Sequence, residues 1–228
     1  LADLTRLGLA GNLATFRLVD RTGATVPGSA LDYNGQAAGY ALRPDDTISY
    51  VSAHDNETWF DAMNVKLAQA TSMADRVRQY DLGVSIVALS QGIPFFHAGD
   101  DLMRSKSGDK NSYDSGDWFN RIDWTGRTSA WGSGLPPASA NQGDWPILSP
   151  LLGDPALGPG PADIRRAGEH FEEMLRIRKS STLFRLRTAA EIQSTLAFLD
   201  GGPAQTPGLA GMLLSRPPGW AHAPGDYG

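Results

Sequence analysis

The stretch that decides how this chain folds is TISYVSAHDN, residues 47–56. Its first seven residues are β-branched, aromatic or small, which is typical of a buried strand. The run stops at three polar residues, His54, Asp55 and Asn56. A second short apolar run, residues 93–98, ends in the same way at Gly99-Asp100-Asp101. We therefore expect two strands whose carboxyl ends both turn polar.

Helical patterns follow each of these runs. The spacing over residues 67–89 predicts a helix that ends near Gly92, and a second helix is expected over residues 162–180. The order strand, helix, strand, helix indicates a βαβα unit, which needs parallel strands. Such folds carry their chemistry at the carboxyl ends of the strands, where the polar triplets lie. The first helix is predicted from a recurring apolar stripe: Met73, Val77, Tyr80, Val84 and Val87.

The remaining segments carry weaker patterns. Residues 1–46 show only weak apolar periodicity, and a turn is expected at Tyr33-Asn34-Gly35. Residues 99–161 are rich in Gly, Pro, Asp, Ser and Trp and are expected to form a loop, too long to be a mere connector. Short strands are expected over residues 195–199 and 209–214, and no internal repeat is present.

Composition excludes several classes of protein. The 228 residues include no Cys, which rules out disulfides, thiolate metal sites and a cysteine nucleophile. A net charge of −5 argues against a nucleic-acid groove, and no apolar run is long enough to span a bilayer. The chain has 26 Gly and 15 Pro, and Asp is far commoner than Glu. These biases favour loops over helices, since Asp and Gly suit turns and caps.

Asp55 is the first candidate functional residue. A carboxylate at a strand's carboxyl end, flanked by His54 and Asn56, can hydrogen-bond a polar ligand in a cleft. The alternative is a turn residue or a helix N-cap. Glycoside hydrolysis usually needs a pair of carboxylates, so Asp55 alone does not define a hydrolase.

The segment 111–121, NSYDSGDWFNR, is the second candidate. Its aromatic residues could stack on a sugar ring, while its carboxylates and guanidinium take hydroxyl contacts. Asp117 and Arg121 lie four residues apart, so a helical turn would bring them together. The alternative is a loop held by buried Trp118 and Phe119 with a surface ion pair. No pair of histidines has metal-ligand spacing, so no metal site is predicted.

Residues 50–58, YVSAHDNET, resemble the fourth conserved region of the α-amylase superfamily, glycoside hydrolase family 13. The motif is most similar to that of bacterial type I pullulanases and plant limit dextrinases. The resemblance covers roughly residues 1–215 and continues through Arg178-Lys179-Ser180-Ser181. Four further stretches are similar to the same group: LTRLGLAGNL (4–13), DYNGQAAGY (32–40), QGIPFFHAG (91–99) and residues 102–124.

The resemblance implies an α/β fold in which residues 1–181 form the C-terminal part of a (β/α)8 TIM barrel. Strands seven and eight and their helices would lie there. Residues 182–215 would begin an all-β sandwich domain, and residues 216–228 would be an unstructured tail. The implied activity is retaining hydrolysis of α-1,6-glucosidic linkages in pullulan, amylopectin and limit dextrins, so the expected partner is an α-glucan.

The resemblance also assigns roles. Of the family's three acting carboxylates, only the transition-state stabiliser has a match, Asp55. Asp55 would bind the sugar at the cleavage site, and His54 matches a histidine that contacts that sugar. Asp117 and Arg121 match a pair that holds a neighbouring glucose. The resemblance also places Tyr113 and Asn56 near the bound sugars, as further substrate-binding residues.

The nucleophile Asp and the acid/base Glu have no match in these 228 residues and would lie upstream of Leu1. We therefore expect a C-terminal fragment that is inactive on its own. The resemblance is compatible with a bound calcium ion, but no group of residues in this sequence can be identified as its ligands. The resemblance spans extracellular or periplasmic bacterial enzymes and plastid enzymes, so no compartment follows.

Two rival interpretations stay open. One is another superfamily member, an isoamylase or a glycogen-debranching enzyme, against which the Ser-Gly-Asp-Trp-Phe-Asn segment argues. The other is a non-catalytic carbohydrate-binding protein built on a degenerate barrel, whose unclosed sheet would expose edges prone to aggregation.

Overall fold

The computed structural model describes residues 1–216, which divide into two compact units. The first unit contains residues 1–49, 86–95 and 175–216. The second contains residues 50–85 and 96–174. Two long helices, α3 (Met73–Leu89) and α7 (Pro161–Ser180), contribute residues to both units. Within the described residues the sheets are four separate strand pairs.

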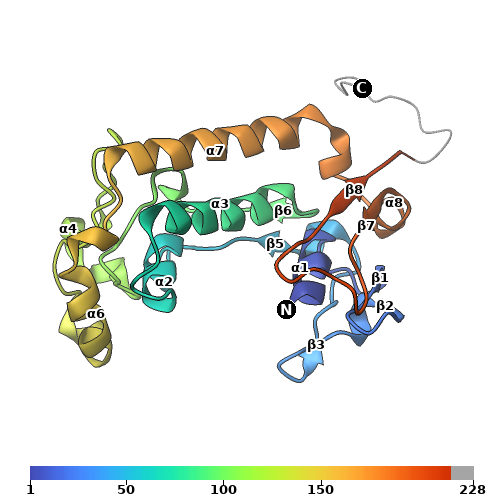
Figure 1. Cartoon of the computed structure of the whole chain (residues 1–228), viewed down its shortest axis with the longest axis horizontal. Helices are drawn as coiled ribbons and strands as arrows, with labels where there is room; N and C mark the ends of the chain where they lie inside the picture. The colour runs from blue at the N-terminus through green and yellow to red at the C-terminus, as the bar shows by residue number, and fades with distance from the viewer. Residues whose placement is uncertain (217–228) are drawn as a thin grey trace. The chain divides into compact units, whose positions relative to one another are not determined.

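The first unit brings the two ends of the described chain together. Figure 1 shows the N-terminal elements, in blue, beside the red β7 and β8. A shared apolar core explains this arrangement, because Leu13, Phe16 and Leu18 pack with Ile192 and Leu196. The elements of this unit that precede the parallel pair are α1 (Ala2–Leu9), β1 (Arg17–Val19), β2 (Thr25–Pro27), β3 (Asp32–Tyr33) and β4 (Gln36–Ala37). Those near its C-terminal end are α8 (Ala189–Thr195), β7 (Leu196–Phe198) and β8 (Met212–Leu214).

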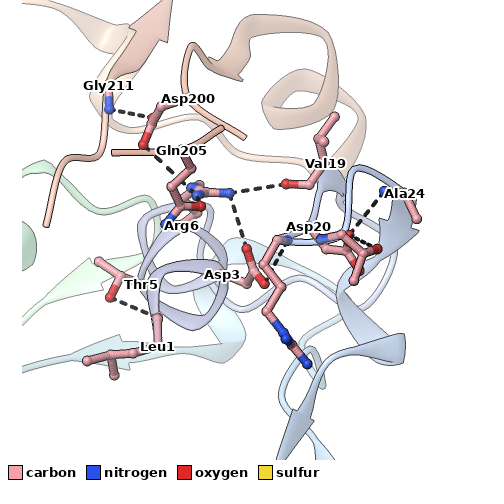
Figure 2. Close-up of polar contacts among 12 residues, drawn as sticks. Leu1, Asp3, Thr5, Arg6, Val19, Asp20, Ala24, Asp200, Gln205 and Gly211 are labelled. Atoms are coloured by element: carbon pink, nitrogen blue, oxygen red, sulfur yellow. Dashed lines mark hydrogen bonds and ion pairs between the residues drawn. The ribbon is translucent and has the colours of Figure 1, made fainter. Parts of the chain in front are cut away.

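A buried arginine reinforces the same unit (Figure 2). Arg6 is fully buried and donates to the Asp3 carboxylate at 3.2 Å and to the Val19 carbonyl at 3.1 Å. It also donates to the Gln205 side chain. One guanidinium therefore joins α1 to β1 and to the loop between β7 and β8.

The expected parallel strands are present but short. β5 (Ile48–Ser49) pairs in parallel with β6 (Ile93–Pro94), with Ile48 opposite Ile93. Both residues are exposed, at 59% and 46%. Regular pairing extends over just two residues of each apolar run.

Helix C-capping by a side chain fixes the chain between α3 and β6. Arg178, on α7, donates to the carbonyls of Ala88, Ser90 and Gly92 at 2.7–3.1 Å. A cation at this position also complements the negative end of the helix dipole. All four residues belong to the first unit.

The second unit is helical around its own apolar core. Phe60, Val77, Tyr80 and Met103 are buried there with Ala167. The segment 99–161, expected to be a loop, contains three short helices, so that expectation was too coarse. Its helices, with the one that precedes α3, are α2 (Trp59–Lys66), α4 (Gly116–Asn120), α5 (Ala138–Asn141) and α6 (Trp145–Leu152). Single 3₁₀ turns lie at Gly28–Ala30, Pro44–Asp46, Asp100–Leu102, Ser112–Asp114, Gln142–Asp144, Pro155–Leu157 and Thr182–Phe184.

Other expectations agree with the structure to different degrees. The helix expected over 162–180 is confirmed as α7, whereas the helix expected over 67–89 begins only at Met73. The turn at Asn34-Gly35 is confirmed, with φ of 53° and 81°. The short strands expected over 195–199 and 209–214 are present as β7 and β8. The predicted tail lies outside the described residues, apart from Arg216.

Candidate functional site

Asp55 and His54 form an exposed pair in the loop that follows β5, after residues 50–53. The His54 Nδ1 atom lies 3.3 Å from the Asp55 Oδ1 atom, and their side chains are 83% and 76% accessible. Both side chains can therefore reach a ligand without any rearrangement. The interpretation of Asp55 as a helix N-cap is wrong, because Thr58 caps α2 by accepting from the Asp61 amide at 3.2 Å.

Asn56 has a backbone role in addition to its exposed side chain. Its φ of 61° lies in the left-handed region, which Asn tolerates better than most residues. Its amide donates to the Lys110 carbonyl at 2.9 Å. The loop after β5 is thus attached to the long segment that follows β6.

A buried carboxylate organises that attachment. Asp61, in the first turn of α2, is fully buried and accepts from the amides of Lys106 at 2.8 Å and Gly108 at 3.2 Å. The Ser105 hydroxyl also donates to it. Burial raises the pKa of the Asp61 carboxyl, and these hydrogen bonds oppose the rise. Between the two amides lies Ser107, whose φ of 55° is strained for a non-glycine residue, so Asp61 holds a strained turn in place.

Lys106 points from this turn toward His54. The residue is 1% exposed, and its Nζ atom donates to the His54 carbonyl at 3.1 Å. Burial lowers the pKa of the Lys106 ammonium, and the charges of Asp109 and Asp61 partly offset that effect. An amino group with this burial lies directly beneath the exposed His54–Asp55 pair.

Asp100 joins the polar ends of the two apolar runs. Its carboxylate accepts from the Ser52 hydroxyl and from the His97 amide, both at 2.8 Å, and its carbonyl accepts from the Tyr80 hydroxyl at 2.6 Å. Burial raises the pKa of Asp100 to about 6. Burial, with help from the cationic Arg104, lowers the pKa of His97 to about 4, so its imidazole is neutral at pH 7.

The second predicted group lies on α4 and just before it. Tyr113 is 88% exposed, and Asp117 is exposed in the first turn of the helix. The Arg121 guanidinium stacks over the Trp118 ring, 4.5 Å from its centroid. Trp118 is itself 55% exposed and donates from Nε1 to the Ser133 carbonyl at 2.8 Å. An exposed, anchored indole with a guanidinium on its face offers a surface on which a sugar ring can stack.

Two details of this group differ from expectation. Asp117 and Arg121 are one helical turn apart, but no ion pair joins them among residues 1–216. Instead, the backbone amide of Arg121 donates a hydrogen bond to the Asp117 carbonyl at 2.8 Å, at the C-terminal end of the helix. Trp118 is exposed, so the interpretation of a loop held by a buried Trp118 is wrong.

Arg104 holds the main chain after α4. It donates to the Asn120 carbonyl at 2.7 Å and to the Ala98 carbonyl at 3.2 Å. No hydrogen bond or ion pair in the described part of the chain joins Asp55 to Tyr113, Asp117 or Arg121. Lys106 contacts the His54–Asp55 loop, whereas Arg104 contacts the end of α4.

The described residues form neither a metal-binding cluster nor a membrane-spanning helix. Across residues 1–216, no group of three or more His, Asp or Glu side chains could hold a metal ion. No described helix is both long and apolar enough to cross a membrane. The buried Asp61 and Lys106 were not predicted as site residues. They lie 45 residues apart in sequence, and although Lys106 falls in the stretch 102–124 that carries the resemblance, the resemblance gave it no role.

Comparison with known proteins identifies the class to which this architecture belongs. Residues 126–224 match the family described as alpha-1,6-glucosidases, pullulanase-type, C-terminal. This match confirms the resemblance inferred from the sequence and shows that the chain carries a pullulanase-type C-terminal region.

Named relatives narrow this class. The chain is 47% identical over 208 residues to chloroplastic pullulanase 1 of Arabidopsis thaliana, covering 91% of this chain and 22% of that protein. It is 41% identical over 214 residues to the pullulanase of Klebsiella aerogenes, covering 94% of this chain and 19% of that protein. A crystal structure of Klebsiella pneumoniae pullulanase complexed with maltotriose matches with a TM-score of 0.87 and 40% identity, over 92% of this chain and 20% of that one. The chain thus spans about a fifth of the length of these relatives.

Proposed function

We propose that this chain supplies the transition-state-stabilising and sugar-binding part of a retaining hydrolase of α-1,6-glucosidic linkages. The substrates would be pullulan, amylopectin and limit dextrins. The observation that carries the proposal is the exposed His54–Asp55 pair, 3.3 Å apart and supported from beneath by buried polar groups. The pullulanase names of the relatives and the maltotriose bound to one of them support the same substrate class.

Asp55 would act on the sugar at the cleavage point. An ionised carboxylate there accepts hydrogen bonds from ring hydroxyls and stabilises the positive charge of an oxocarbenium-like transition state. His54 would donate to the same sugar, and Asn56 would line the same loop. Tyr113, Asp117 and Arg121 would bind a neighbouring glucose, with the exposed Trp118 as a stacking surface.

The fold proposed for this role is the end of a (β/α)8 barrel. In this scheme β5 and β6 are the seventh and eighth strands, and residues 182–215 begin a β-sandwich. The parallel pairing of β5 with β6 supports the scheme, as do the polar segments at their carboxyl ends. The boundaries at residues 181 and 215 stay predictions.

The two groups that break the bond are proposed to come from outside these 228 residues. The pattern Arg-x-Asp occurs at residues 43–45 and 121–123, but neither copy lies on a strand, and no Gly-Glu-Gly-Trp type motif is present in the sequence. The isolated chain should therefore release no reducing sugar from pullulan, while a longer gene product that carries both motifs should do so. Release by the isolated chain well above a blank would contradict this assignment. Comparing pullulan with glycogen would separate a pullulanase from an isoamylase-like or glycogen-debranching enzyme.

Asp55→Asn tests the assigned role directly in the full-length gene product. Because a transition-state contact is lost, kcat on pullulan should fall on the order of 10²–10³-fold while KM changes little. The matched control is Asp75→Asn, a half-exposed carboxylate on α3 that should leave both parameters unchanged. A near-normal kcat for Asp55→Asn would remove Asp55 from the mechanism.

A further inference from the structure

Lys106 lies beneath the proposed site, and none of the substrate-binding or catalytic roles proposed above belongs to it. Its side chain is almost fully buried, yet within residues 1–216 its ammonium makes a single hydrogen bond, to the His54 carbonyl at 3.1 Å. The nearest opposing charges are those of Asp109 and Asp61, which favour the ammonium electrostatically. The residue lies neither in the exposed pair nor in the group on α4.

Stability alone does not account for a lysine at this position. Burial disfavours the ammonium, as the lowered pKa of Lys106 shows. An apolar side chain of similar length, such as methionine, would fill the space without that penalty, and replacing buried charges by well-packed apolar groups is often neutral or stabilising. The distinctive effect of the ammonium is therefore its contact with His54.

The backbone around Lys106 is arranged so that the side chain reaches His54. Ser107 and Gly108 both have left-handed φ values, 55° and 77°. Asp61 holds the turn by accepting from the amides of Lys106 and Gly108. Strained backbone of this kind persists only where surrounding groups determine it, and it gathers at functional sites.

The segment 54–56 is consequently held at both ends by the chain that follows β6. Lys106 binds the carbonyl of His54, and the Lys110 carbonyl accepts from the amide of Asn56. Asp55 lies between these two contacts, with an exposed side chain and a fixed main chain. Fixing the peptide on either side limits the directions in which its carboxylate can point.

We propose that Lys106 is a positioning residue, whose buried ammonium fixes the main chain at His54 and so orients the Asp55 carboxylate toward the sugar. This inference rests on the proposed function, because it assigns Lys106 to the same reaction. Lys106 itself touches no substrate. Its contribution is to keep a transition-state contact preorganised, and a misplacement of about 1 Å can cost ~10²-fold in rate.

The test uses the full-length gene product with Lys106→Met, Lys106→Arg and the control Lys66→Met, an exposed lysine on α2 in the same unit. Lys106→Met should lower kcat on pullulan about 10²-fold with little change in KM. Lys106→Arg, which keeps a charged donor, should recover a substantial part of that loss, and Lys66→Met should match the parent. Hydrogen exchange should accelerate in peptides covering residues 50–58 of Lys106→Met and stay unchanged in those covering α7.

Each outcome bears on the inference. A wild-type kcat for Lys106→Met would overturn it, and so would faster exchange throughout the second unit, which would reveal a general structural role. Equal loss of activity in the Met and Arg variants would also count against it. If the parent protein fails to cleave pullulan, the proposed function falls, while the exchange of residues 50–58 still reports whether Lys106 holds His54.

Discussion

Replacing Asp100 by Asn should reveal a pH-dependent cost of burying this carboxylate. Asp100 is 4% exposed and accepts from the Ser52 hydroxyl and the His97 amide. Burial is the main reason that its pKa is raised from 3.8 to about 6 in the folded protein. The amide of Asn keeps one oxygen for these donors but cannot ionise, so Asp100→Asn removes the titration from the folded state.

The direction of the effect follows from proton linkage. Below about pH 3.8, Asp100 is protonated in both the folded and the unfolded state. Between pH 3.8 and about 6, the folded state holds the proton more tightly, so the free energy of unfolding of the parent falls as the pH rises. Above that window both states are ionised and the loss is complete. The parent should therefore lose stability relative to Asp100→Asn as the pH rises through 6.

The size of the effect follows from the raised pKa. A difference of about two pKa units corresponds to roughly 3 kcal/mol at 1.36 kcal/mol per unit. Changing the hydrogen bonds adds an offset that does not depend on pH. The informative quantity is therefore the change in the difference between variant and parent from pH 4 to pH 7.5. We expect it to be roughly 2.5 kcal/mol in favour of the variant, because a small part of the loss has already occurred at pH 4.

Hydrogen exchange of peptides spanning residues 96–110, in the full-length gene product, measures the opening free energy locally. Opening free energies of parent and variant are compared at several pH values, after correction for intrinsic exchange. A difference that stays constant from pH 4 to pH 7.5 would refute the assignment of a raised pKa to Asp100. Ser52→Ala provides a second arm, because the Ser52 hydrogen bond lowers the pKa of Asp100 and its removal should move the transition to higher pH.

Two further substitutions test packing. Gly83→Ala should destabilise the second unit by about 1 kcal/mol in chemical denaturation, because the new Cβ would lie 2.7 Å from the Trp59 ring, and overpacking outweighs the gain in helix propensity. The matched change Gly8→Ala in α1, where the nearest atom is 4.0 Å away, should stabilise slightly, and equal effects at both sites would contradict the packing argument. Arg6→Met should cost about 3 kcal/mol, because it leaves the buried Asp3 carboxylate without its cationic partner. Arg21→Met, at an exposed position, should cost almost nothing, and a loss of similar size there would contradict the role of Arg6.

Helix predictions succeeded where an apolar stripe was long and failed where caps set the boundary. The pattern over α7 predicted its whole length. The first predicted helix began six residues too early, because Ser72 accepts from the Asp75 amide and starts α3 there. Thr188 and Glu191 form a capping box that begins α8. The spacing Thr-x-x-Glu is visible in the sequence, but the prediction of helices from apolar stripes does not detect it.

The predicted site residues were readable because they form contiguous motifs. Adjacent residues such as His54 and Asp55 show their relation in the sequence itself. Asp61 and Lys106 do not, since their relation depends on a turn that meets a helix 45 residues away in the chain. Asp117 and Arg121 had helical spacing, but the Trp118 ring competes for the guanidinium and receives it.

The shared core of the first unit has a consequence for how the protein is made. Phe16 packs with Ile192, so the ribosome must add about 176 residues after Phe16 before this core can close. At a synthesis rate of roughly 5–20 residues per second, the N-terminal apolar residues wait about 10–35 s without their partners. The second unit, whose residues all precede 175, can complete its core first. Nascent chains should therefore depend on chaperones most strongly during this interval.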